Sequence, residues 1–494
     1  MRKLYTLLIV VITSSFLNSQ TIRVGAKHFN EGYILSEILS EMLESGGYKV
    51  ERNFSLGGTL VCFDALRYHQ IDIYPEYTGT ISGEILKLDQ NVSVTALNQK
   101  LKDEYMLEIS EPYGFNNTYA LTVTKQTSEK CNLHTISDLK QHPEIEIALS
   151  YEFLKRKDGW ENLALAYGLR NKPVGIEHGL AYQALVEGKI ELTDAYSTDG
   201  EIVKYGLVIL DDDRNFFPKY FAVSFFRDDI DPKVKDIVSR LTSQISEIEM
   251  QSMNFEVLYE KKSFADVASE FLKKKNLINP ETQMKSVNPV SEILSKTLTH
   301  LKITFIALLM AIILAIPLGI VIYFYSSVSK PILYFAGLLQ TIPSIALLAL
   351  MIPLFGIGVI PAIAALFLYA LLPILRNTAT GLFSVDPLLK KVARGIGLNG
   401  FQRMRYVELP LAMPSIFAGI KTAAVINIGT ATLAAFIGAG GLGEFIVTGL
   451  ALNDTSLILK GAIPAAILAI LVEFMFELIE KLFIPKHLKE QTGK

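Results

Sequence analysis

The sequence predicts a two-lobed α/β domain followed by an all-α polytopic domain with about five transmembrane helices. The first observation is length, because 494 residues are far more than a single domain needs. The second is that residues 21 to about 290 hold most of the charge. The third is that the chain from Leu301 onward runs in apolar stretches of roughly 20 residues, the length that spans a bilayer as helix. The net charge of −3 offers no basic surface of the kind that binds nucleic acid.

The N-terminus has the layout of a secretory signal. Arg2 and Lys3 precede an apolar run at 4–17, and polar residues follow at 18–20. We therefore expect the next domain to be exported, with the signal either cleaved or kept as an anchor. The predicted layout is a signal peptide at 1–19, an extracytoplasmic domain at 20–275, a linker at 276–292, a membrane domain at 293–482 and a cytoplasmic tail at 483–494.

The exported region alternates short strand patterns with helix patterns. Residues 22–27 read as a strand and are followed by an amphipathic helix at 31–45. A second strand pattern lies at 144–150, and a helix-period apolar face continues over 234–260. This alternation over about 250 residues favours two lobes over one, and ligands bind in the cleft between such lobes.

Charge around the apolar stretches indicates how the membrane domain is oriented. The loop at 377–411 carries a cluster of lysines and arginines, whereas the only charges in the loops at 355–360 and 438–454 are acidic. Since cytoplasmic loops are enriched in basic residues, loop 377–411 is predicted to be cytoplasmic. The N-terminal domain then lies outside an inner (plasma) membrane that the chain crosses several times. The predicted spans are about 301–325, 331–355, 359–376, 412–437 and 455–480.

The loop at 385–410 contains a glycine and a proline at a particular spacing. Its segment KVARGIGLNGFQRMRYVELP, residues 391–410, resembles the EAA loop of permease subunits in binding-protein-dependent, ATP-driven importers. The resemblance implies two short helices that dock on a separate ATPase subunit, whereas the alternative is an ordinary amphipathic loop. Three positions depart from the family pattern, with Lys391 for an acidic residue, Val392 for alanine and Val407 for isoleucine. The ATPase-coupling residues it implies are Lys391, Ala393, Gly397, Val407, Leu409 and Pro410.

The chain shows no nucleotide-binding motif in the required context. Gly438, Gly440 and Gly443 spell GxGxxG, but they follow an apolar membrane segment and not a strand, so a tight extracytoplasmic turn is the better interpretation. No GxxxxGK[ST] phosphate loop occurs. We therefore expect no cofactor in this chain, with ATP and Mg²⁺ bound by a partner ATPase. Metal-ligand spacing is absent as well, so no metal site is predicted.

Tyrosines recur beside polar residues in several loops of the exported region. Each one taken alone is a packing residue, but the set resembles the osmoprotectant-binding proteins of glycine betaine, carnitine and choline importers. That family has a two-lobed fold of the periplasmic-binding-protein type. The segments that carry the resemblance are 26–37 (AKHFNEGYILSE), 72–80 (DIYPEYTGT), 116–121 (NNTYAL), 153–160 (FLKRKDGW), 193–200 (TDAYSTDG) and 211–220 (DDDRNFFPKY).

The resemblance implies specific ligand-binding residues. Four tyrosines would enclose a trimethylammonium group, at Tyr77, Tyr119, Tyr196 and Tyr220. A lysine, a threonine and an arginine would hold the ligand's carboxylate, at Lys27, Thr80 and Arg156, although a surface charge or a lobe–lobe ion pair is the alternative for the two cations. Asn117 stands where some relatives carry an acidic residue, so choline-like and zwitterionic ligands both stay open, and so does ergothioneine.

Both halves together predict the fused receptor and permease of an ATP-driven importer for quaternary ammonium osmoprotectants. The chain is expected to be a transporter subunit and not an enzyme, to form a homodimer, and to work with separate ATPase subunits. A ligand-sensing membrane receptor and a membrane-anchored enzyme are the alternatives from other classes, but the chain lacks a signalling output domain and a convincing nucleophile and base. Cys62 and Cys131 could form a disulfide or remain free.

Overall fold

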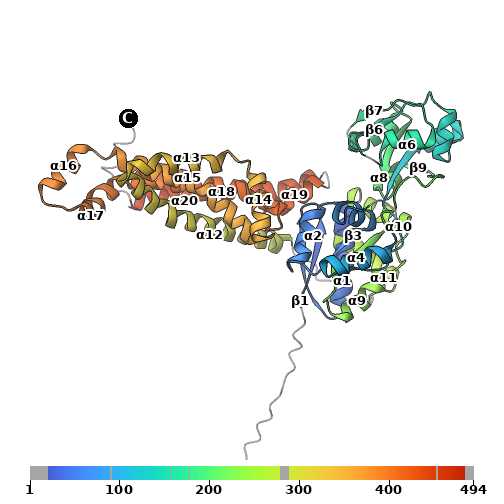
Figure 1. The fold of residues 1–494 in the computed structure, drawn as a ribbon, viewed down its shortest axis with the longest axis horizontal. Coiled ribbons are helices and arrows are strands. Elements are labelled where there is room, and N and C mark those ends of the chain that lie inside the picture. Colours follow the sequence, from blue (N-terminus) through green and yellow to red (C-terminus); the bar gives the residue numbers. More distant parts are fainter. Residues whose placement is uncertain are drawn as a thin grey trace, which may run out of the picture.

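The computed structural model describes residues 21–88, 92–156, 158–176, 178–278, 289–451 and 454–483. The predicted signal peptide, most of the predicted linker and nearly all of the predicted tail lie outside these residues. Figure 1 shows an α/β region, coloured blue to green, at one end of a bundle of helices coloured yellow to red. The predicted fold class, an α/β domain followed by a helical membrane domain, is confirmed.

The first lobe is built on a five-stranded sheet. Its strands in spatial order are β2 (Lys49–Leu56), β1 (Thr21–Lys27), β3 (Ile73–Tyr77), β10 (Ala222–Arg227) and β4 (Leu107–Ile109). β1 pairs in parallel with β2 and β3, while β10 runs antiparallel between β3 and β4. The helices of this lobe are α1 (Asn30–Ser45), α2 (Thr59–Arg67), α3 (Thr78–Thr80), η1 (Ile81–Ile85), α4 (Val94–Tyr105), α9 (Pro232–Ser239), α10 (Glu247–Leu258) and α11 (Phe264–Lys274).

The second lobe comes from the middle of the chain. A three-stranded antiparallel sheet, β8 (Leu192–Tyr196), β5 (Tyr119–Thr124) and β9 (Leu207–Leu210), lies beside the parallel pair β6 (Ala148–Ser150) and β7 (Val174–Ile176). Its helices are α5 (Lys125–Cys131), η2 (Ile136–Gln141), α6 (Trp160–Tyr167), α7 (His178–Val186) and α8 (Gly200–Tyr205). Both cysteines are free, because Cys62 is buried in the first lobe and Cys131 lies in the second.

Two crossing segments, residues 110–118 and 211–221, connect the lobes. They are hydrogen-bonded to each other, since the amide of Asn117 donates to the carbonyl of Tyr220 at 3.0 Å. The hydroxyl of Thr118 likewise donates to the carbonyl of Pro218 at 3.0 Å. A paired crossing of this kind joins the lobes through a narrow hinge and leaves a cleft between them.

The helix predicted at 234–260 is wrong as a single element. The chain instead forms α9 and α10, with a turn between them in which Ser243 adopts a left-handed φ of 56°. Ser246 and Glu249 form a capping box, in which each side chain satisfies a main-chain amide at the start of α10. The capping box therefore determines where α10 begins, although the helical spacing of apolar residues continues across the turn.

The membrane domain holds four helical segments, within the described residues, that are long and apolar enough to cross a bilayer. α12, α15 and α18 pack together closely, as Gly419 illustrates, because a Cβ there would lie 2.7 Å from the side chain of Asn377. The helical elements are α12 (Pro289–Phe324), α13 (Ser326–Thr341), α14 (Ser344–Phe355), α15 (Val359–Ser384), α16 (Pro387–Gly395), α17 (Gly400–Arg403), η3 (Met404–Glu408), α18 (Leu409–Ala431), η4 (Thr432–Phe436), α19 (Gly443–Ala451) and α20 (Thr455–Phe483).

The second predicted span, 331–355, is not one straight helix. α13 and α14 meet at an angle of 102°, and Pro343 stands at the break. Proline removes a main-chain donor and bends a helix at this point. The hydroxyl of Tyr369, on α15, donates to the carbonyl of Ile342, which satisfies an acceptor that the break exposes. The described residues therefore contain four helical segments that could cross a membrane, or five if this bent pair forms one span.

The first lobe rests directly on the membrane domain. Leu56 forms an antiparallel β-bridge with Ile437, and the amide of Gly57 donates to the carbonyl of Phe436 at 3.2 Å. On the other side of α2, the amide of Ile357 donates to the Gln70 side chain at 2.7 Å. Figure 1 places the segment containing α16 and α17 at the opposite end of the helical bundle from this contact.

Candidate functional site

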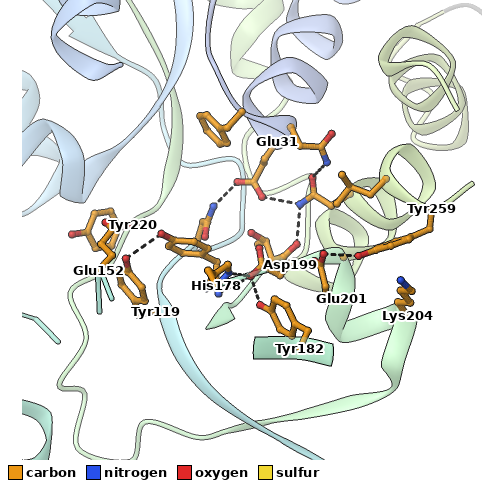
Figure 2. A pocket seen from close by; sticks show the side chains of 18 of the residues that line it. Glu31, Tyr119, Glu152, His178, Tyr182, Asp199, Glu201, Lys204, Tyr220 and Tyr259 are labelled. Carbon is orange, nitrogen blue, oxygen red and sulfur yellow. Dashed lines mark hydrogen bonds and ion pairs between the residues drawn. The ribbon is translucent and has the colours of Figure 1, made fainter. Parts of the chain in front are cut away.

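A cavity of about 870 Å³ lies between the two lobes. Figure 2 shows this cavity from close by, with side chains that reach it from both lobes and from α10. All eight residues that the sequence predicts as ligand-binding lie on its wall. They are Lys27, Tyr77, Thr80, Asn117, Tyr119, Arg156, Tyr196 and Tyr220. The fold thus brings together residues nearly 200 positions apart, and their role in binding stays a prediction.

The four tyrosines reach the cavity from different elements. Tyr119 and Tyr196 are direct partners on the antiparallel strands β5 and β8, with ring centroids 4.8 Å apart and hydroxyls 3.0 Å apart. Tyr77 ends β3 in the first lobe, and Tyr220 lies on the second crossing segment. Gly79 makes room for Tyr220, because a Cβ at this glycine would lie 2.6 Å from the tyrosine ring. Rings from both lobes and from the hinge therefore converge on one space.

The two cations predicted to hold a ligand carboxylate already have carboxylate partners. Lys27 Nζ lies 2.5 Å from Glu76 Oε1 in a buried pair. Arg156 binds Asp158 through two nitrogens, at 2.7 and 2.9 Å, and this hydrogen bonding raises the pKa of Arg156. Each cation also lies over a tyrosine ring, with Lys27 Nζ 5.2 Å from the centroid of Tyr77 and Arg156 Cζ 5.1 Å from that of Tyr119.

A buried carboxylate, Glu31, connects the first lobe to the hinge. It accepts hydrogen bonds from the hydroxyl of Tyr77, from Asn117 Nδ2 at 3.0 Å and from Asn254 Nδ2 at 3.1 Å. Burial raises the pKa of the Glu31 carboxyl, and these hydrogen bonds oppose that rise. The sequence prediction missed Glu31, although it lies in the first turn of the predicted helix and within the segment 26–37.

A second polar cluster, also missed, lies behind Tyr196. His178 Nε2 is 3.3 Å from Asp199 Oδ2, and His178 Nδ1 is 3.7 Å from Asp194 Oδ2. The hydroxyl of Tyr182 donates to Asp199 at 2.5 Å, as Figure 2 shows. Burial opposes the charge on His178, but the two carboxylates outweigh it and raise the pKa of His178 to about 10. The only sequence signal was the pair of aspartates on either side of Tyr196, since nothing local marks His178.

The predicted coupling loop forms two short helices, α16 and α17, which is the secondary structure that the resemblance implies. The Asp386 side chain caps α16 by accepting from the amide of Leu388 at 2.7 Å. Gly397 has a φ of +89°, a conformation that side chains rarely adopt, and no atom lies within 4 Å of a Cβ built there. Of the other predicted coupling residues, Lys391 is exposed, Ala393 is buried, and Val407, Leu409 and Pro410 lead into α18.

Nothing in the described part of the chain resembles a metal centre, because no group of three or more His, Cys, Asp or Glu side chains is placed to hold an ion. The cleft of a hinged two-lobed domain is suited to enclosing a small solute. This two-lobed domain is attached to a bundle of membrane helices. The chain is therefore of the class in which a solute receptor is joined to a permease.

Comparison with known proteins identifies both halves. Residues 20–274 match the family described as the substrate binding domain of ABC-type glycine betaine transport systems. Residues 296–488 match the inner membrane component of binding-protein-dependent transport systems. The chain therefore belongs to the ABC-type osmoprotectant importers, as a substrate-binding domain fused to a permease domain. The expected family is confirmed, and the chain is a multi-pass protein of the inner membrane and a transporter component.

Individual relatives agree with this assignment. The chain is 46% identical over 198 residues to the glycine betaine/carnitine/choline transport system permease protein OpuCB of Bacillus subtilis, which covers 40% of this chain and 91% of that protein. It is 34% identical over 272 residues to the carnitine transport binding protein OpuCC of Listeria monocytogenes, covering 52% and 88%. A crystal structure of a glycine betaine/carnitine/choline ABC transporter superposes with a TM-score of 0.51 at 32% identity, covering 52% of this chain and 100% of that one.

The His178 cluster predicts a pH-dependent stability of the second lobe. Folding raises the pKa of His178 from 6.5 to about 10, so its contribution is complete below pH 6.5 and is lost as pH rises through about 10. The free energy of unfolding of the wild type should therefore fall between these pH values relative to that of His178→Gln. Fluorescence of Trp160, the sole tryptophan, reports unfolding of this lobe in denaturant titrations of the full chain.

The exposed His134 provides the matched control, because His134→Gln should follow the wild type at every pH. Parallel pH profiles for the wild type and His178→Gln would show that the histidine carries no extra proton in the folded state.

Proposed function

We propose that this chain binds and translocates quaternary ammonium compounds, such as glycine betaine, carnitine or choline, as the receptor and permease subunit of an ATP-driven importer. The observation that carries the proposal is the convergence of Tyr77, Tyr119, Tyr196 and Tyr220 on one cavity between the lobes. The relatives support the same solute class, because the OpuCB and OpuCC proteins are named for glycine betaine, carnitine and choline transport.

Aromatic rings are the groups that a quaternary ammonium requires. Such an ion has no N–H to donate, so a protein recognises it through ring faces, each of which stabilises a desolvated cation by about 0.5 to 2 kcal/mol. Three or four faces together reach a large share of the roughly 8 kcal/mol that micromolar affinity requires. Because the rings belong to both lobes, a bound ligand would hold the lobes closed.

The charges on the cavity wall add a preference for a positive head group. Lys27 and Arg156 are each balanced by a nearby carboxylate, whereas the hydrogen-bond donors that reach Glu31 are neutral hydroxyl and amide groups. A ligand cation beside Tyr77 would lie near this carboxylate. The guanidinium of Arg156 has five N–H donors, so it can bind Asp158 and also offer donors to a ligand carboxylate.

The coupling loop is the proposed docking site for a separate ATPase subunit. Its exposed side chains include large apolar groups on both short helices, which is unusual for a surface unless a partner covers them. They are Leu388, Val392, Ile396, Phe401 and Tyr406. ATP and Mg²⁺ would be bound by that partner, and closure of two ATPases on the loops of a homodimer would open the solute pathway.

The arrangement also supports an extracytoplasmic receptor. The α/β region and the segment containing α16 and α17 lie at opposite ends of the helical bundle, so a coupling loop in the cytoplasm would place the receptor outside (Figure 1). Receptor and permease share one chain, which keeps the receptor at a high local concentration near the solute pathway. The proposed cycle is closure of the lobes on the ligand, release into the permease, and resetting by ATP hydrolysis.

The tyrosine cage predicts a large loss of affinity when a ring is removed. Tyr196→Ala or Tyr220→Ala should weaken choline binding at least ten-fold, or by about 1.4 kcal/mol. Isothermal titration calorimetry on the full chain in nanodiscs measures the dissociation constant directly. Tyr151→Ala is the control, because Tyr151 is exposed and lies away from the cavity wall. Unchanged titrations for Ala variants of all four cage tyrosines would rule the cage out.

Arg156 predicts discrimination between ligands with and without a carboxylate. Arg156→Met leaves the nearly buried Asp158 without its partner, and any resulting disturbance of the cleft affects every ligand alike. The loss specific to a carboxylate should therefore appear as a larger drop in affinity for glycine betaine than for choline, by at least ten-fold. Equal losses in the same calorimetric assay would assign Arg156 to the cleft wall and not to the ligand.

Gly397 predicts a defect confined to coupling. A leucine at this position meets a left-handed backbone, and its side chain would also obstruct the close approach of a partner to the loop. Gly397→Leu should abolish solute uptake and ligand-stimulated ATP hydrolysis in proteoliposomes that contain the full complex, without changing the affinity of the distant cleft. The control is Gly395→Ala, since Gly395 has open space around it and no positive φ. Normal transport by Gly397→Leu would mean that the loop does not couple.

A further inference from the structure

An open cavity lies at the receptor contact, beside the ligand cleft. This rim cavity has a volume of about 370 Å³ and is lined by Lys27, His28 and Phe29 at the end of β1, by the turn at 57–59, and by Phe436 of the permease domain. Its size falls within the range of small-molecule sites. It is therefore a space shared by receptor and permease.

The rim cavity and the ligand cleft share part of their walls. Lys27 and Phe29 line both spaces, and Phe29 lies 6.1 Å from Tyr77, the cage tyrosine of the first lobe, between ring centroids. Phe29 therefore belongs to the walls of both spaces, and Phe436 of the permease domain lines the rim cavity with it.

Main-chain contacts hold the rim cavity in place. The Leu56–Ile437 bridge and the hydrogen bond from the Gly57 amide to the Phe436 carbonyl do not use the phenylalanine ring. His28 adds a contact across the same boundary, because its ring centroid lies 6.1 Å from that of Phe436. The main chain around Phe436 is thus fixed by contacts that do not use its ring.

The chemistry of the rim cavity suits the same head group as the cage. Phe29 and Phe436 are its aromatic residues, with Lys27 Nζ 5.4 Å from the centroid of Phe29. Burial lowers the pKa of His28 and so disfavours the charged form of this imidazole. The one formal charge near the cavity, on Lys27, is balanced by Glu76 at 2.5 Å. A quaternary ammonium would meet aromatic surface here without an unbalanced positive charge.

We propose that the rim cavity is a transit site, in which Phe436 of the permease receives the quaternary ammonium group as it leaves the cage. This inference rests on the proposed function and adds a binding site in the permease half. Transfer from one set of ring faces to another avoids full hydration of the ion between receptor and pathway. The receptor can then release its ligand while its first lobe stays docked.

The test replaces the ring of Phe436 while keeping the main-chain contacts. Phe436→Leu removes the aromatic face at similar apolar size, and Phe436→Tyr retains it. Choline uptake and ATP hydrolysis are measured with the full complex in proteoliposomes, and choline affinity is measured on the full chain in nanodiscs. Phe355→Leu, at an exposed aromatic outside the rim cavity, is the matched control.

A transit site predicts that Phe436→Leu lowers kcat/KM for choline uptake about three- to ten-fold, the loss of one ring face. Phe436→Tyr and the control should transport within two-fold of the wild type. The dissociation constant of the cleft and the choline-stimulated rate of ATP hydrolysis should not change, so the number of choline molecules imported per ATP falls.

Three outcomes would overturn the transit site. Wild-type uptake by Phe436→Leu means that the ring is not used, and equal loss in the tyrosine variant means that shape and not the ring face matters. Loss of choline-stimulated ATP hydrolysis assigns Phe436 to docking. If the wild-type complex imports neither choline nor glycine betaine, the proposed function itself fails, which is a result distinct from any difference among variants.

Discussion

The cleft depends on the hydrogen bonds that the buried carboxyl group of Glu31 accepts. A desolvated carboxylate needs hydrogen-bond donors on all sides, and here they come from separate parts of the fold. Tyr77 ends a strand of the first lobe, Asn117 lies on a crossing segment, and Asn254 lies on α10. Satisfying Glu31 therefore fixes a cage tyrosine, the hinge and a helix at once. Asn254 also donates to the carbonyl of Thr198 at 2.8 Å, so the same hydrogen-bond network extends to the second lobe.

The membrane half meets a different constraint, because it lies in a bilayer and joins the receptor contact to the predicted coupling loop. Helices suit this because every backbone group is satisfied within the segment, and the single break at Pro343 is repaired by Tyr369 from a neighbouring helix. One end of the bundle holds the first lobe through main-chain contacts near Ile437. The other end exposes the coupling loop. Between these ends, α12, α15 and α18 pack against one another.

Sequence reasoning succeeded where a local pattern decides structure and failed where patterns compete. The predicted tyrosines all line one cavity. Tyr77 and Tyr196 end strands, Tyr119 begins one, and Tyr220 lies on a crossing segment, so all four stand where strands meet the cleft or the hinge. The prediction of one helix at 234–260 was wrong because the helical spacing of apolar residues continues through a turn. That turn ends at Ser246, where the capping box starts α10. The predicted span at 331–355 corresponds to the bent pair α13 and α14, because Pro343 interrupts the helix, a bend that hydropathy alone does not reveal.

The sequence by itself determined the division into a polar receptor and an apolar bundle, since hydropathy is a local property and bilayer thickness fixes the length of a span. It also determined the family, through residues whose order along the chain is preserved. Only the tertiary structure decided which charges are already balanced. Lys27 meets Glu76 across 49 positions and Glu31 meets Asn254 across 223, and no local pattern encodes such pairs. They form because burial removes water from groups that chain folding alone brings together.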